Sequence, residues 1–392
     1  MTRAPVHGGD SHNFGRRVAL HEGSVVKPRT LLWEWLLLAF ESPLRAKLSE
    51  LGADVFDFLP SLRFSSHDAR GGGEVERAVL APLSPDIDSN RLAHVTGRAI
   101  ALYTWLGLSD LHWENLVLGE REGRIVFGPL DVEMILDDLE LPTQTKLLPE
   151  ADDDIVDVCR HACGVRRVLA FLGKPIGPEA LVAMVAGYRR ALGLLDKHAA
   201  AIAAVFEQLP GLADAPIRVL LRGTDEYVRA KTTAVWPPLL DAEKEQLARG
   251  DIPYFFRLYG RPEIRFFTEP SLTRSEALPL QGDVPTLEPL LDVSKELRSP
   301  KRKLLREQGL FALIGAFDHR SFKGRHTFED VSITFRGRTL IAELGRDELE
   351  TERDVGRFVA SVYLPCTCGE TRDVFVPAVT MCDASPRGAR RL

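Results

Sequence analysis

The chain has 392 residues, of which 45% are hydrophobic and 27% are charged, and its formal net charge is -6. This composition is typical of a soluble globular protein, and the length allows two or three domains or one large two-lobed unit. The acidic balance gives no reason to expect nucleic acid as a partner. No run of about eighteen apolar residues occurs and no signal-peptide core follows Met1, so we expect no membrane span and a cytoplasmic location.

The first quarter of the chain is predicted to hold a hairpin and two helical segments. Residues 16–27 alternate loosely between apolar and polar, as a short hairpin does. Residues 31–52 look helical, and their longest apolar stretch is interrupted by Glu34. Residues 60–90 are rich in glycine and proline and are expected to form an irregular, flexible loop. Asn90 can cap a helix that runs to about Leu106.

The rest of the chain is predicted to be helical in the middle and β-rich at the end, with the proline-containing residues 268–294 as a connection. Predicted helices lie at about 152–173, 178–194, 197–208, 215–231, 241–250 and 300–317. Predicted strands lie at 115–118, 124–127, 331–335, 338–342, 357–364 and 373–380. Together these elements predict an α+β protein.

The five cysteines are an odd number, which does not suggest a disulfide framework. Cys159 and Cys163 lie one turn apart in an apolar predicted helix and are expected to be core thiols. Cys366, Cys368 and Cys382 could ligate zinc, but the spacing fits no standard site and the sequence offers no obvious fourth ligand.

The most informative segment is Ser109-Asp110-Leu111-His112-Trp113-Glu114-Asn115, followed after a predicted hairpin by Asp131 and Glu133. Asp110 can orient a hydroxyl, while Asn115 and Asp131 carry the oxygen ligands that hold magnesium on ATP. Glu133 could be a further ligand or could support the ligands. The plainer alternative is that Asp110 caps a turn and Asp131 ends a strand.

A lysine precedes these groups in the chain, at the end of the predicted strand Val25-Val26-Lys27. Kinases use such a lysine to grip phosphate oxygens as a point charge. Taken alone, Lys27 would more simply be a surface residue. The order lysine, aspartate, asparagine, aspartate favours the phosphate role.

Two further segments carry groups suited to phosphate chemistry. Gly8 to Gly15 packs glycines around Asp10 and His12, and an imidazole can move a proton near neutral pH. Arg218 and Arg222, one turn apart in a predicted helix, would lie on one face and could clamp a phosphate. The alternatives are a disordered leader for the first segment and a solvated basic face for the second.

Together these segments resemble the dehydratase domain of class II lanthipeptide synthetases (DUF4135-type), a kinase-like module. That family carries the motifs G-D-x-H-N, Y-K-P-R, D-x-H-x-x-N, I-D-x-E, R-x-x-x-R-x-T-x-x-Y and G-D-I-P-Y-F in this order. The matching segments begin at Gly9, Val26, Asp110, Leu130, Arg218 and Gly250, and the resemblance spans about residues 9–270.

The resemblance implies a two-lobed, kinase-like (lipid-kinase-like) fold. Its reduced N-terminal lobe would occupy residues 1–60 and its helical catalytic lobe residues 61–270. Residues 271–392 would form a C-terminal α/β extension that matches the family only loosely. We expect a separate cyclase or leader-binding protein as a partner, since only eight residues precede Gly9 and no cyclase ligand set is found.

The implied activity is the dehydration of Ser and Thr in a precursor peptide, which the enzyme would contact through its leader and core. ATP with Mg²⁺ phosphorylates the hydroxyl, and the same site eliminates phosphate to leave a dehydroamino acid. By motif, the phosphorylation residues are Lys27, Asp110, His112, Asn115 and Asp131. The elimination residues are Asp10, His12, Arg218 and Thr224. The nucleotide would be held by Lys27, Asn115 and Asp131, and the metal by Asn115, Asp131 and Glu133.

β-Elimination needs a base for the α-proton, for which Lys27 and His12 are both candidates, and a cation for the departing phosphate, for which Arg218 is the obvious choice. Two other functions compete with this one. A kinase that only phosphorylates a peptide or small molecule would not need Arg218 and Thr224. A truncated, non-catalytic module that binds peptide or nucleotide would not need the complete polar set.

Overall fold

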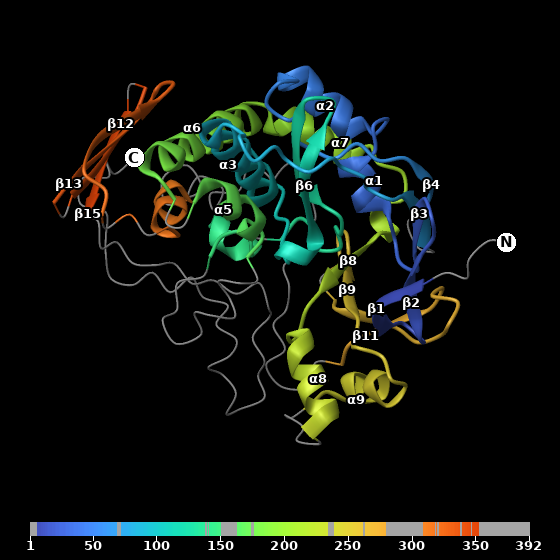
Figure 1. Ribbon diagram of the computed structural model, residues 1–392. Helices are drawn as coiled ribbons and strands as arrows, with labels where there is room; N and C mark the ends of the chain where they lie inside the picture. Colours follow the sequence, from blue (N-terminus) through green and yellow to red (C-terminus); the bar gives the residue numbers. More distant parts are fainter. Residues whose placement is uncertain are drawn as a thin grey trace.

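A computed structural model describes residues 6–68, 72–137, 139, 141–149, 163–173, 176–233, 239–261, 263–279, 309–317, 319, 321–337, 339–345 and 347–352. The architecture is mixed α+β, as the sequence predicts: helices occupy the centre, and small antiparallel sheets lie at opposite sides of them (Figure 1). Within the described residues, no helix has the length and apolar character needed to cross a bilayer.

The N-terminal sheet has five strands in the order β1-β2-β3-β5-β4, each antiparallel to its neighbours. Its strands are β1 Val6–His12, β2 Arg16–Leu20, β3 Ser24–Lys27, β4 Phe64–Asp68 and β5 Gly72–Glu76. The predicted hairpin at 16–27 is confirmed as β2–β3. The irregular loop predicted for 60–90 is wrong, because β4 and β5 lie within it. Gly73 serves close strand packing: a Cβ there would overlap the carbonyl oxygen of Ser66.

The helical segment predicted at 31–52 is two helices, α1 Leu32–Leu38 and α2 Pro43–Gly52. Ser42 caps α2, accepting a hydrogen bond from the backbone N–H of Arg45 at 3.1 Å, and Pro43 stands at the first helical position. Serine followed by proline is a strong helix start, which explains why the chain turns before α2. Helix α1 ends at Leu38, and Glu34 lies in its first turn.

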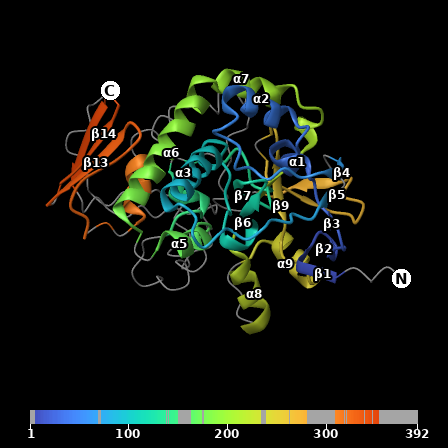
Figure 2. The ribbon, with the colours of Figure 1, turned by 45° about the horizontal axis from the view of Figure 1, so that its top comes forward.

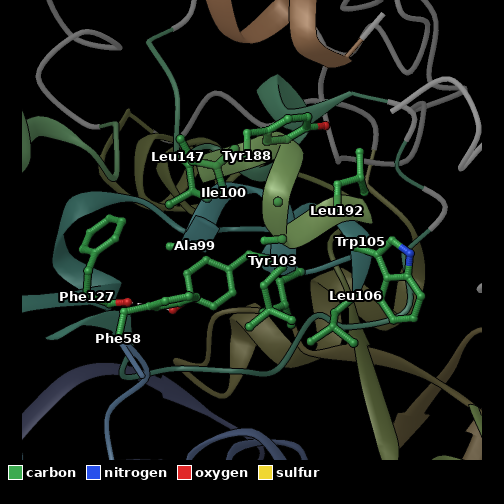
Figure 3. Packing of buried hydrophobic residues seen from close by; sticks show 14 of the residues in the cluster. Phe58, Ala99, Ile100, Tyr103, Trp105, Leu106, Phe127, Leu147, Tyr188 and Leu192 are labelled. Atoms are coloured by element: carbon green, nitrogen blue, oxygen red, sulfur yellow. Dashed lines mark hydrogen bonds between the residues drawn. The ribbon is translucent and has the colours of Figure 1, made fainter. Parts of the chain in front are cut away.

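The helical centre is built on α3 Ser89–Trp105 and α6 Pro178–Lys197, which pack at close range. Gly97 of α3 and Gly187 of α6 permit this approach, since a Cβ on either would overlap the main chain of the other helix. Figure 3 shows part of the hydrophobic core to which both helices contribute, including Tyr103 and Trp105 of α3 and Tyr188 of α6. The cap of α3 is Asp88 rather than the predicted Asn90, whose N–H donates to Asp88 Oδ1 at 2.9 Å.

Shorter elements complete this region. They are the hairpin β6 Leu116–Arg121 and β7 Arg124–Pro129, and the helices α5 Arg166–Leu172 and α7 Ala199–Glu207. The hairpin and the predicted helices at 178–194 and 197–208 are confirmed, while only the end of the one at 152–173 lies among the described residues.

The helix predicted at 215–231 is wrong in its first half. Its apolar start forms β8 Pro216–Val219, which pairs with β9 Phe255–Leu258 in a second sheet, and α8 Thr224–Thr233 begins only after Gly223. Ile217 and Val219 are β-branched, and their backbone groups bond to a strand about forty residues later in the chain. The sheet continues through β10 Arg265–Phe267 and β11 Ser275–Ala277, and α9 Asp241–Ala248 precedes β9. Helix α9 ends before Gly250 (φ 89°), as predicted.

The C-terminal part of the described chain is a four-stranded antiparallel meander in the order β12-β13-β14-β15. Its strands are β12 Gly324–Phe328, β13 Val331–Arg336, β14 Thr339–Leu344 and β15 Asp347–Glu352. The predicted strands at 331–335 and 338–342 are confirmed as the antiparallel pair β13–β14, and residues 309–315 are the described end of the helix predicted at 300–317. Figure 2 shows the meander beside α6, on the opposite side of the molecule from the N-terminal sheet. The predicted strands at 357–364 and 373–380 lie outside the described residues, as do Cys159, Cys366, Cys368 and Cys382; Cys163 is buried.

Candidate active site

One cavity of about 720 Å³ opens between the N-terminal sheet, the loop after α3 and strand β8. Nine of the residues selected from the sequence line it: Asp10, His12, Asp110, His112, Asn115, Asp131, Glu133, Arg218 and Thr224. Segments that are more than two hundred residues apart in the chain thus converge on one space. Lys27 is not among the residues that line the cavity.

The loop between α3 and β6 presents Asp110 to the cavity. Asp110 has a left-handed backbone conformation (φ 59°), which is uncommon for residues other than glycine. The amide nitrogen of Asn115 donates to the Asp110 carbonyl at 2.9 Å, so the asparagine supports the turn from within the loop. With its nitrogen used in this way, the oxygen of the Asn115 amide is the atom left for a ligand.

Lys146 is a cavity residue that sequence reasoning missed. Its Nζ lies 2.8 Å from Oδ1 of Asp110, and its backbone is also left-handed (φ 63°). The two loops are joined directly, because the N–H of Leu111 donates to the carbonyl of Thr145 at 2.9 Å. Residues other than glycine in the left-handed conformation occur often at functional sites, and both members of this ion pair have it. No motif in the sequence singles out this lysine.

Lys27 lies beneath the cavity with its side chain only 9% exposed. Its Nζ donates to both carboxylate oxygens of Glu34, at 2.9 and 3.0 Å, and to the carbonyl of Leu130 at 2.5 Å. The lysine at the end of β3 is therefore tied both to helix α1 and to the segment that carries Asp131. Sequence reasoning assigned no role to Glu34. Glu34 could have been recognised from the sequence, because it is the one acidic residue in an apolar stretch and a buried carboxylate needs a partner.

Arg29 connects this buried pair to the acids at the cavity floor. Its guanidinium contacts the carboxylates of Glu34, Asp131 and Glu133. Burial alone would raise the pKa of the Asp131 carboxyl, but the positive charge of Arg29, with that of Lys27, outweighs it and holds the pKa below its ordinary value. Asp131 is therefore kept ionised.

Arg218 and Arg222 have separate environments, so the predicted shared helical face is wrong. Arg218 lies in β8, and its Nη1 lies 3.1 Å from Oε2 of Glu133. Arg222 follows the end of that strand and is buried against Glu243, with Nε 2.9 Å from Oε1. The Tyr227 hydroxyl donates to the same Glu243 oxygen at 2.7 Å. Arg222 consequently stabilises the junction of α8 and α9, and only Arg218 of the pair reaches the cavity.

The loop between β1 and β2 is fixed by Asp251, which is completely buried. The carboxylate of Asp251 accepts hydrogen bonds from Ser11 Oγ at 2.6 Å, from Phe14 N at 2.7 Å and from Gly15 N at 2.9 Å. Residues 13–15 are all left-handed, with φ of 48°, 69° and 80°. The segment Gly250 to Phe255 is thus the anchor of the segment around His12.

His12 has one ring nitrogen engaged and lies against an aromatic wall. Its Nδ1 is 2.8 Å from the carbonyl oxygen of Ile252, and its ring centroid is 5.9 Å from that of Tyr254. The Arg218 guanidinium lies over the same Tyr254 ring, 5.3 Å from its centroid. Burial, assisted by the charge of Arg218, lowers the pKa of His12 below its ordinary value, which favours the neutral imidazole.

The remaining selected residues lie around the rim. Asp10 is exposed, and His112 and Thr224 are partly buried, Thr224 as the first residue of α8. Among the residues that the structure describes, no three or more His, Cys, Asp or Glu side chains are grouped as a metal site. Mg²⁺ commonly needs only one or two protein ligands when phosphate oxygens and water supply the rest. Asn115 and Asp131 could hold a cation that arrives with a nucleotide. Asp131 is contacted by one arginine and is 34% exposed, whereas Glu133 is contacted by both Arg29 and Arg218 and is 11% exposed.

Comparison with known proteins adds no assignment, because no protein-family model and no curated protein matches the sequence. The function is therefore argued from the residues and the cavity.

Proposed function

We propose that the protein is an ATP- and Mg²⁺-dependent dehydratase that phosphorylates Ser or Thr in a peptide and then eliminates the phosphate. The observation that carries the proposal is that the residues suited to the two half-reactions line one cavity. Asp110, Asn115 and Asp131 belong to the first set, and His12 and Arg218 to the second. Phosphorylation alone would not need Arg218 and Thr224, which favours the dehydratase over a kinase that only phosphorylates.

The surroundings of Lys27 support a kinase-like, two-lobed fold. The lysine ends a strand of an antiparallel sheet and is paired with Glu34 of the following helix, as the phosphate-binding lysine of kinases is paired with a helical glutamate. The five-stranded sheet would form the small lobe, and the helices around α3 and α6 the large one. Asp110, Asn115 and Asp131 line the cavity and Lys27 contacts the segment that carries Asp131, which supports phosphoryl transfer.

In the phosphorylation step, Asp110 would accept a hydrogen bond from the substrate hydroxyl and orient its oxygen toward the γ-phosphate. Lys146 holds that carboxylate in place and supplies positive charge beside it. Asn115 and Asp131 would hold Mg²⁺, which neutralises charge on the phosphates when bound. Lys27, kept in position by Glu34, adds a further cation below.

In the elimination step, phosphate is the leaving group and negative charge develops on its oxygens. Arg218 is positioned for this charge, because Glu133 and Tyr254 fix its guanidinium at the cavity wall. Burial alone would lower the pKa of Arg218, but Glu133 outweighs it and keeps the pKa above the ordinary value, so the group stays charged. Thr224, at the start of α8, lies on the same cavity and can donate a hydrogen bond.

The proposal is tested by mass spectrometry of a pool of synthetic Ser- and Thr-containing peptides incubated with the protein, ATP and Mg²⁺. Wild type should give dehydrated peptides, each lighter by one water. Asn115→Ala should give neither phosphorylated nor dehydrated peptides, because a metal ligand is lost. Asn90→Ala, at the start of α3 and outside the cavity, is the matched control and should behave as wild type.

The possible outcomes separate the competing functions. Phosphopeptide without dehydrated product from the wild type would favour a kinase that only phosphorylates. No modified peptide, combined with no stabilisation of the protein by ATP and Mg²⁺, would refute the enzymatic proposal and favour a binding module. Unchanged modification by Asn115→Ala would refute the metal assignment.

A further inference from the structure

The elimination step requires a base that removes the α-proton. The hydrogen bonds of Lys27 exclude this lysine from that role. Its Nζ donates to Glu34 at 2.9 and 3.0 Å and to the Leu130 carbonyl at 2.5 Å. An ammonium group that donates to a carboxylate and a carbonyl carries its full set of protons and has no lone pair. Lys27 is also beneath the cavity and not on its wall.

The surroundings of His12 have the opposite effect. A carbonyl oxygen can only accept, so the 2.8 Å contact between Nδ1 and the Ile252 carbonyl identifies Nδ1 as the protonated ring nitrogen. In a neutral imidazole the lone pair is then on Nε2. His12 lines the cavity that also holds Arg218. The hydrogen bond thus selects the tautomer that can take up a proton at Nε2.

On the basis of the proposed dehydratase function, we propose that His12 Nε2 takes the α-proton of the phosphorylated Ser or Thr, and that Asp251 is the positioning residue that holds His12 for this step. A bond forms between Nε2 and the α-hydrogen as the Cα–H bond breaks. The Cα–H electron pair becomes the Cα=Cβ double bond. The Cβ–O bond breaks, and its electron pair leaves with the phosphate toward Arg218.

The arrangement around Tyr254 places the two roles at neighbouring points of the cavity. His12 meets the Tyr254 ring edge-on, with centroids 5.9 Å apart, and the Arg218 guanidinium lies 5.3 Å from the centroid of the same ring. Base and cation thus both lie against one buried tyrosine. A phosphorylated residue between them could present its α-hydrogen to one group and its phosphate to the other.

Asp251 acts on His12 through the backbone. Its carboxylate holds both sides of the imidazole segment, because Ser11 and the N–H groups of Phe14 and Gly15 all donate to it. The adjacent Ile252 completes the arrangement: its N–H donates to the Ser11 carbonyl at 2.7 Å, and its carbonyl receives His12 Nδ1. Removing the negative charge of Asp251 should therefore weaken the hydrogen bonds that position His12. It should leave the positions of Asp110 and Asn115 unchanged.

The test uses synthetic phosphoserine peptides, with ATP omitted, and follows the dehydrated product by mass spectrometry. His12→Ala should lower the rate of elimination roughly a hundredfold or more. It should still phosphorylate the corresponding unmodified peptides when ATP is added. Added imidazole should restore elimination, which it would not do if His12 were merely structural. Lys27→Met should lose phosphorylation yet still eliminate phosphate from the synthetic phosphopeptide.

The positioning role has its own variants. Asp251→Asn should lower kcat for elimination about tenfold, with KM for the phosphopeptide unchanged, because a misplaced base affects the chemical step more than binding. Ser11→Ala removes one of the hydrogen bonds to Asp251 and should lower the same kcat severalfold; it carries the test if Asp251→Asn does not fold.

The outcomes distinguish the base, the positioning residue and the proposed function. Elimination by His12→Ala at the wild-type rate would overturn the assignment of the base. Loss of elimination in Lys27→Met would overturn it as well, provided that circular dichroism shows this variant to be folded. Equal loss of phosphorylation and elimination in Ser11→Ala would overturn the positioning role of Asp251. Failure of the wild type to eliminate phosphate from any peptide would instead count against the proposed function itself.

Discussion

Glu34 is the residue whose removal tests the buried charge arrangement most directly. Its carboxylate, 1% exposed, is shared by Lys27 and Arg29, whose side chains are each 9% exposed. Glu34→Gln keeps the shape and removes the charge, so two buried cations lose a common partner. Breaking a buried pair on one side typically costs about 3–5 kcal/mol. We expect the lower end, about 3 kcal/mol, since Arg29 keeps Asp131 and Glu133.

Urea unfolding monitored by tryptophan fluorescence measures this loss. With a denaturant slope of roughly 3 kcal/mol/M, the midpoint should fall by about 1 M. The control is Glu50→Gln, which breaks the exposed pair between Lys47 and Glu50, where the side chains are 30% and 64% exposed. Exposed pairs contribute about 0–1 kcal/mol, so the control midpoint should hardly move.

The nucleotide provides a second readout of the same variant. Glu34 holds Lys27 in place, so ATP with Mg²⁺ should stabilise the wild type more than Glu34→Gln. A midpoint that falls no further than that of the control would refute the reasoning, because Lys27 and Arg29 would then not depend on Glu34.

Three other predictions address the site, the packing and the pH dependence. Arg218→Ala should accumulate phosphopeptide instead of dehydrated peptide in the mass-spectrometric assay, and normal dehydration would exclude Arg218 from phosphate release. Gly187→Ala should destabilise the protein by about 1–3 kcal/mol in urea, because the new Cβ overlaps the His94 carbonyl of α3, whereas Gly193→Ala, in open space on the same helix, should stabilise it by roughly 0.5–1 kcal/mol. Burial, with the nearby charge of Arg98, lowers the pKa of His94 from 6.5 to about 4. The unfolded chain therefore takes up this proton at higher pH than the folded one, so stability present above pH 6.5 should be lost as pH falls toward 4, by roughly 1–3 kcal/mol, and His94→Gln should flatten that slope of the urea midpoint against pH.

The elements that were predicted correctly depend on short-range signals. The hairpins β2–β3, β6–β7 and β13–β14 and the helix α6 were each predicted from one contiguous stretch of sequence. The errors occurred where tertiary contacts oppose local preference. Gly73 was interpreted as part of a loop although it allows two strands to lie close together, and residues 216–219 were interpreted as helix although they pair with β9.

The candidate site divides in the same way. The sequence alone identified the polar groups and their order. Asp110, Asn115 and Asp131 lie in short motifs, and the chemistry of these motifs can be inferred without knowing the fold. That they share a cavity with His12 and Arg218 was decided by the tertiary structure.

The partners of these groups were also decided only by folding. Glu34, the partner of Lys27, and Lys146, the partner of Asp110, belong to none of the motifs. Asp251 belongs to the motif that begins at Gly250, but nothing in that motif indicates that it holds the segment around His12. Ser11 and Asp251, which form one hydrogen bond, are 240 residues apart. A sequence pattern records which neighbours along the chain can act together, whereas a buried charge is matched by whichever side chain the fold brings within reach, because leaving it unpaired in a low-dielectric interior is too costly.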